Sequence, residues 1–136
     1  MNGMKRARGL RAVVIGALGL ASVTLAAVPA FAKGDVEVTV PRTAHVGKTF
    51  TIKADGDDDI AGYLHQLCLE ERTGKQTWHQ ENCTTPVEGD ARLTTHGSSA
   101  HRGDLQFRAV LYGLKNKHDH RPVRLHTSGV ATVHIR

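Results

Sequence analysis

The sequence has few of the features that mark the common classes of enzyme. It contains two cysteines, one tryptophan, two tyrosines and three phenylalanines in 136 residues, so its hydrophobic core must be mostly aliphatic. There is no GxSxG nucleophile elbow, no HExxH zinc motif and no glycine-rich phosphate loop after a strand. We therefore expect a protein that is not an enzyme and that needs no cofactor.

Long apolar runs are also scarce: the chain has a single one, near its start. The run AVVIGALGLASVTLAAV (residues 12–28) follows four basic residues and precedes the small-residue site Ala30-Phe31-Ala32. This order is typical of a secretory signal peptide, although the run is nearly long enough for a membrane anchor. We predict cleavage after Ala32 and a secreted, extracellular protein. Residues 33–136 would then form a single domain with no membrane span.

Cleavage would also change the charge. The formal charge of +5 includes the four basic residues of the signal. Without them, 18 − 4 = 14 lysines and arginines face 13 acidic residues, which leaves about +1. A high precursor pI therefore does not indicate nucleic-acid binding, and we exclude that partner.

The two cysteines predict a disulfide between Cys68 and Cys83. Two cysteines in an exported chain are typical of a disulfide rather than a metal site. They bracket the segment YLHQLCLEERTGKQTWHQENC (residues 63–83), which has the pattern of two strands around a turn at residues 73–75. A disulfide closing about 15 residues contributes roughly 3 kcal/mol in the chain-entropy model.

The same pairing fixes a register for the hairpin. If Cys68 faces Cys83, then Thr73 faces Trp78 and the four residues 74–77 form the loop. Loops of this length are common in hairpins.

Alternating apolar and polar residues predict strands through the rest of the chain. Short strands separated by Gly or Pro favour a sandwich or barrel. We predict an all-β fold, a two-sheet antiparallel sandwich with an immunoglobulin-like arrangement and seven or eight strands. Besides the cysteine hairpin, its strands are expected at residues 35–41, 49–55, 91–96, 104–113 and 123–136, the last broken at Ser128-Gly129.

The order of these segments resembles a known class of protein. A VTVP strand precedes VGKTFTI (residues 46–52), and the cysteine hairpin precedes FRAVLY (residues 107–112). This pattern is similar to small secreted immunoglobulin-like domains of bacteria, although here the cysteines bracket one hairpin instead of joining two sheets. A narrower resemblance is to the neocarzinostatin-like carrier proteins, but this chain lacks the second cysteine pair of that family. These resemblances imply a binding or structural module, or alternatively a small-ligand or metal carrier.

Two groups of residues are candidate metal ligands. Asp55, Asp57 and Asp59 lie in a dense acidic stretch, and carboxylate oxygens suit calcium. The stretch does not match an EF-hand loop, and aspartates are also common in solvated turns. His118 and His120 would point to the same side of an extended segment and suit zinc or copper, or they are simply polar loop residues.

Aromatic residues and one tripeptide suggest binding surfaces. Trp78, with Tyr63 or Tyr112 near it, would form a platform for a glycan or peptide if exposed. The alternative, which we favour, places Trp78 in the core over the disulfide. The tripeptide Arg102-Gly103-Asp104 matches an integrin-binding motif, but it is also a frequent chance sequence.

These observations leave two function classes open. The first, which we favour, is a secreted, non-catalytic module, expected to be a monomer, that engages an extracellular protein or a cell-wall or glycan surface. The second is the carrier of a small ligand or metal.

Overall fold

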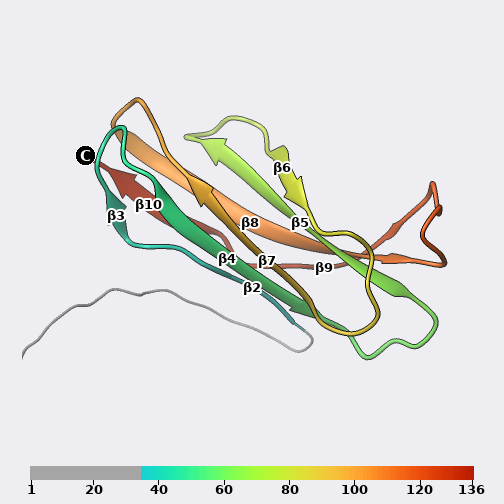
Figure 1. The fold of residues 1–136 in the computed structure, drawn as a ribbon. Coiled ribbons are helices and arrows are strands. Elements are labelled where there is room, and N and C mark those ends of the chain that lie inside the picture. The colour runs from blue at the N-terminus through green and yellow to red at the C-terminus, as the bar shows by residue number, and fades with distance from the viewer. Residues whose placement is uncertain (1–34) are drawn as a thin grey trace, which may run out of the picture.

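The structure is a computed structural model that describes residues 35–136, and the predicted signal peptide (residues 1–32) lies outside the described residues. The described part is all β, and Figure 1 shows its long strands lying along nearly the same axis, with arrowheads at both ends of the molecule. No helix in residues 35–136 is long and apolar enough to cross a membrane. The strands are β2 (Asp35–Thr39), β3 (Thr43–Ala44), β4 (Phe50–Asp57), β5 (Leu64–Thr73), β6 (His79–Cys83), β7 (Ala91–Gly97), β8 (Gly103–Leu114), β9 (Val123–Thr127) and β10 (Ala131–Ile135).

Two sheets make up the fold. The small sheet has the strand order β2-β4-β7, and the large sheet has the order β3-β10-β8-β5-β6, with β9 also paired to β8. All pairs are antiparallel except the short β3–β10 pair, which is parallel. The long β8 is therefore central, because it joins the cysteine hairpin on one side to the C-terminal segment on the other.

One hydrophobic core lies between the sheets. Strict alternation in β4 buries every second side chain, as expected for a strand with one face on a core. The rings of Phe50 and Phe107 meet edge to face across the sheets, with centroids 6.0 Å apart. The core residues are Val36, Val38, Val40, Phe50, Ile52, Ala54, Leu67, Leu69, Ala91, Leu105, Phe107, Ala109, Leu111, Val133 and Ile135.

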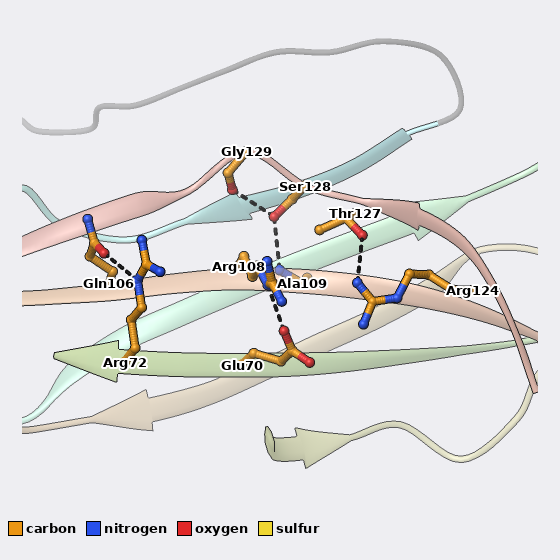
Figure 2. Close-up of polar contacts among 9 residues, drawn as sticks. All are labelled: Glu70, Arg72, Gln106, Arg108, Ala109, Arg124, Thr127, Ser128 and Gly129. Carbon is orange, nitrogen blue, oxygen red and sulfur yellow. Dashed lines mark hydrogen bonds and ion pairs between the residues drawn. The ribbon is translucent and has the colours of Figure 1, made fainter. Parts of the chain in front are cut away.

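The sequence predicted the two-sheet sandwich correctly, but it predicted too few strands. Thr43–Ala44 pairs with the end of β10 and adds a strand that is too short to show alternation. The terminal segment divides into β9 and β10, because the chain leaves the ladder around Ser128 and Gly129. At this break the Ser128 hydroxyl accepts a hydrogen bond from the Ala109 amide (2.9 Å) and donates one to the Gly129 carbonyl (2.8 Å), as Figure 2 shows.

Candidate functional site on the outer face of the large sheet

The large sheet has an outer face that points away from the core. In β5 and β8 the odd-numbered residues point inward, so the even-numbered ones point outward. Their register brings outward residues together in cross-strand pairs, and such pairs are close enough to interact. The pairs are Gln66 with Tyr112, Cys68 with Val110, Glu70 with Arg108 and Arg72 with Gln106.

The predicted disulfide is present on this face. Cys68 and Cys83 are directly opposed in β5 and β6, with Cα atoms 4.0 Å apart, and their sulfurs are bonded. The bond ties the edge strand β6 to the interior strand β5. As the spacing predicted, it clamps one hairpin and does not join the two sheets.

The predicted register fails beyond the disulfide. Leu69 faces Asn82, but Glu70 faces Gln80, so Glu81 is an extra residue in β6. This β-bulge shifts the rest of the hairpin by one position. The prediction that Thr73 faces Trp78 is therefore wrong: β5 ends at Thr73, β6 begins at His79, and five residues connect them.

Trp78 is half-buried and lies outside the core, so its predicted place in the core is also wrong. Its ring stands over two guanidinium groups of the outer face. The Cζ atoms of Arg72 and Arg108 lie 4.3 and 4.4 Å from the ring centroid. Both distances are well within the range of a cation–π interaction. The loop and the bulge thus place the single tryptophan on the sheet surface.

Hydrogen bonds hold the two guanidinium groups in position. Arg108 Nε donates to Glu70 Oε1 at 2.6 Å, and Arg72 Nε donates to Gln106 Oε1 at 2.7 Å (Figure 2). Glu70 is a buried charged residue, at 9% exposure, so Arg108 supplies the partner that a desolvated carboxylate requires. Both side chains that contact Trp78 are thereby ordered before any partner binds.

A second aromatic–arginine pair lies farther along the same face. The Arg124 Cζ atom lies 6.0 Å from the Tyr112 ring centroid, and Arg124 Nη1 donates to Thr127 Oγ1 at 3.5 Å (Figure 2). Tyr112 is four residues beyond Arg108 on β8, a distance of about 13 Å in a strand. The outer face therefore carries an arginine next to an aromatic ring at two separate points.

Tyr63 does not join Trp78, although the sequence suggested that they lie near each other. Tyr63 precedes the first residue of β5, whereas Trp78 follows its last. A Cβ added at Gly113 would lie 2.9 Å from Tyr63 Cγ and 3.0 Å from Leu125 Cδ1. The Tyr63 ring thus packs against bare backbone at the opposite end of β5.

The acidic stretch does not gather its carboxylates around one point. Asp55 lies 3.3 Å from Arg92 Nε, and Asp57 Oδ1 accepts a hydrogen bond from the Asp58 amide at 2.8 Å. Asp59 is exposed in the following loop. Within residues 35–136 no group of three or more His, Cys, Asp or Glu side chains is placed to hold a metal ion. Calcium binding by Asp55, Asp57 and Asp59 therefore has no assembled site in this part of the chain.

Asp58, which the sequence did not single out, is the buried member of the acidic stretch. Its Oδ1 accepts from the Ile60 amide at 2.6 Å, and its Oδ2 is hydrogen-bonded to His126 Nε2. His126 belongs to β9 of the large sheet, and Asp58 follows β4 of the small sheet. This pair links the two sheets near one end of the sandwich.

His118 and His120 lie in a compact turn, not in the extended segment that the metal prediction assumed. The Asp119 carboxylate accepts hydrogen bonds from the amides of Lys115 and Arg121, both at 2.9 Å. These bonds hold the pKa of Asp119 below its ordinary value. Both histidines are exposed, and as stated above the described residues assemble no three-ligand group around them.

The Arg102-Gly103-Asp104 tripeptide is placed at the start of β8. Asp104 Oδ1 is hydrogen-bonded to His134 Nδ1 at 2.6 Å, across the β8–β10 pair. The Asp104 side chain remains 55% exposed, and one of its oxygens is engaged by His134 on the surface of the sheet.

Glu71 is a titratable group near the end of the interior strand β5. Partial burial raises the pKa of its carboxyl above the ordinary value of 4.5, and the nearby Glu81 carboxylate raises it further, while His79 lowers it. Glu81 is the bulge residue of the edge strand β6, so the bulge brings two carboxylates together where β5 pairs with β6.

Comparison with known proteins supports the fold. The chain is similar to a CARDB domain from Pyrococcus furiosus solved in complex with di-metal ions, with a TM-score of 0.52 and 12% identity over 74% of this chain and 85% of that one. It is also similar to a PKD domain of an M14-like peptidase from a Thermoplasmatales archaeon, with a TM-score of 0.53 and 16% identity over 75% and 97%. The chain has an immunoglobulin-like β-sandwich fold. CARDB and PKD domains are non-catalytic modules, and at these identities the likeness concerns the fold alone. No protein-family model matches the sequence, and no curated protein matches it.

Sequence reasoning missed the arginines of the candidate site. Arg72, Arg108 and Arg124 look like ordinary outward-facing charges of separate strands. The signal that could have identified one of them, Arg72, is the cysteine pair itself: once β5 lies beside β6, Arg72 and Trp78 must lie at the same end of the hairpin.

Proposed function

We propose that the mature protein is secreted and acts outside the cell as a non-catalytic binding module, and that the outer face of its large sheet is the binding surface. One observation carries this proposal: the single tryptophan is held half-exposed over two ordered arginines on a sheet face, instead of in the core.

The residue types on this face support a binding role. Tryptophan, tyrosine and arginine carry much of the binding energy in protein interfaces, because they combine large contact area with directed polar groups. Here all three occur on one face, and Glu70 and Gln106 order two of the arginines by hydrogen bonds. A surface ordered in advance loses less entropy on binding.

The carrier alternative has less support. The space between the sheets, where a sandwich would hold a small ligand, is filled by fully buried side chains, among them Phe107, Leu67 and Leu111. A ligand there would have to displace the core.

The test is binding of the mature protein to envelope fractions of the producing cell. We expect Trp78→Ala to reduce the bound fraction at least fivefold, because a central tryptophan typically contributes more than 1 kcal/mol to an interface. The control is Ile60→Ala, which removes an apolar side chain of 51% exposure from a different loop. Equal binding by wild type and Trp78→Ala would refute the proposal, provided that circular dichroism shows Trp78→Ala and Ile60→Ala to be folded.

A further inference from the structure

We infer that the partner of this face is an acidic protein surface, and that Arg72 and Arg124 contact its carboxylates. This inference rests on the proposed function and names the chemistry of the partner. It follows from the pairing of the arginines, from the distribution of charge over the two sheets and from the shape of the face.

Of the three arginines of the face, one is paired with a carboxylate and two are not. Arg108 is paired with Glu70, and its side chain is 23% exposed. Arg72 and Arg124 are hydrogen-bonded to uncharged groups, the Gln106 amide and the Thr127 hydroxyl. In residues 35–136 neither has a carboxylate within ion-pair distance. Each therefore keeps its charge and free N–H groups, and a guanidinium fork matches a carboxylate.

Charge is distributed unequally between the two outer faces. The small sheet presents four carboxylates against Lys53 and Arg92, and two cross-strand pairs there, Asp35 with Asp57 and Glu37 with Asp55, join like charges. The outward positions of β5, β8 and β9 in the large sheet carry three arginines against Glu70 and Asp104. Two further carboxylates of this sheet, Glu71 and Glu81, lie together at the β5–β6 bulge. An acidic partner is thus repelled by the small sheet and attracted to the arginines on the outward positions of the large one, and such asymmetry orients a complex.

The shape of the face favours a protein over a small anion. Small-molecule sites are concave and enclose most of the ligand. Here the two aromatic–arginine pairs are spread about 13 Å apart along β8, and the residues between them, Cys68 and Val110, are buried at 2% and 0% exposure. A surface of this extent suits carboxylates held apart on a protein, with Trp78 and Tyr112 contributing apolar contact.

The test uses immobilised poly-L-glutamate as the probe, with poly-L-lysine and polygalacturonate in parallel, and measures binding of the mature protein by biolayer interferometry. We expect binding to poly-L-glutamate that weakens as salt rises. Arg72→Gln and Arg124→Gln should each weaken it about three- to tenfold, the effect of losing one charge-assisted contact. The matched control is Lys53→Gln, which removes one positive charge from the other face and should change affinity less than about twofold.

Three results with the polymer probes and one with the envelope fractions would overturn the inference. No binding to poly-L-glutamate would remove the acidic partner, and an equal effect of Lys53→Gln would show that net charge alone is responsible. Binding to polygalacturonate at least as tight as to poly-L-glutamate would replace the protein partner with an anionic polysaccharide. Envelope binding that depends on Trp78 but not on Arg72 or Arg124 would leave the proposed function intact while this inference fails. Poly-L-glutamate binding without Trp78-dependent envelope binding would refute the proposed function while leaving the preference of this face for carboxylates intact.

Discussion

The ion pair between Glu70 and Arg108 should be a main support of the outer face, and its removal should be measurable. The Glu70→Gln variant keeps the shape of the side chain but leaves the Arg108 charge without a partner. Removing one partner of a fully buried pair destabilises a protein by roughly 3–5 kcal/mol, whereas exposed pairs are worth up to about 1 kcal/mol. The side chains of Arg108 and Glu70 are 23% and 11% exposed, so we expect a loss of about 2 kcal/mol between these limits.

A double-mutant cycle isolates the pair. We expect the free energies of unfolding of Glu70→Gln, Arg108→Gln and the double variant to give a coupling of about 1–2 kcal/mol. The matched control is the pair of Arg92 and Asp55, whose side chains are 76% and 59% exposed, and whose coupling should be below about 0.5 kcal/mol.

Urea unfolding is the assay, because the chain has one tryptophan and it stands directly over Arg108. Trp78 fluorescence therefore reports on the outer face, while circular dichroism reports on the whole sandwich. A coupling between Glu70 and Arg108 no larger than that of the control pair would refute the reasoning.

Three further outcomes follow from the structure. The pKa of the Glu71 carboxyl is raised in the folded protein, so folding favours its protonated form. The stabilisation that this gives at low pH is lost as the pH rises through the folded-state pKa. Glu71→Gln should therefore be more stable than wild type at pH 7 and equal to it below about pH 4, measured by urea unfolding at both values; no difference at pH 7 would contradict this. Asp119→Ala should speed hydrogen exchange at the amides of Lys115 and Arg121, because the Asp119 carboxylate accepts hydrogen bonds from both. Unchanged exchange at these amides would show that other contacts order the turn. Replacing Cys68 and Cys83 together by alanine should lower the free energy of unfolding by about 3 kcal/mol, and a loss below about 1 kcal/mol would show that the β5–β6 ladder needs no clamp.

The strands were predictable where burial has a period of two. β4 alternates strictly and β8 alternates from Leu105 to Ala109, so core residues such as Ile52 and Phe107 follow from the sequence alone. The pairing of Cys68 with Cys83 followed from their being the only two cysteines. What these cases share is that a local pattern determines the outcome.

The candidate site was not predictable in the same way, because it depends on register. One extra residue, Glu81, shifts the hairpin and leaves Trp78 in the loop, and no sequence pattern marks that bulge. The contact of Arg108 with Glu70 joins residues 38 positions apart and follows only once β5 is paired with β8. Similarly, Thr43–Ala44 forms a strand because the end of β10 lies beside it.

The most direct test of the binding surface uses Trp78 itself as the reporter. Mature protein labelled with 5-fluorotryptophan has one labelled position, since the chain contains one tryptophan, so its ¹⁹F NMR spectrum should show one main resonance. If the outer face of the large sheet is the binding surface, envelope fragments that retain the protein will shift or broaden that resonance, and retention of the Trp78→Ala variant will be at least fivefold lower. Retention of the protein with an unchanged resonance, under conditions where the free and bound forms are resolved, would place the binding surface elsewhere.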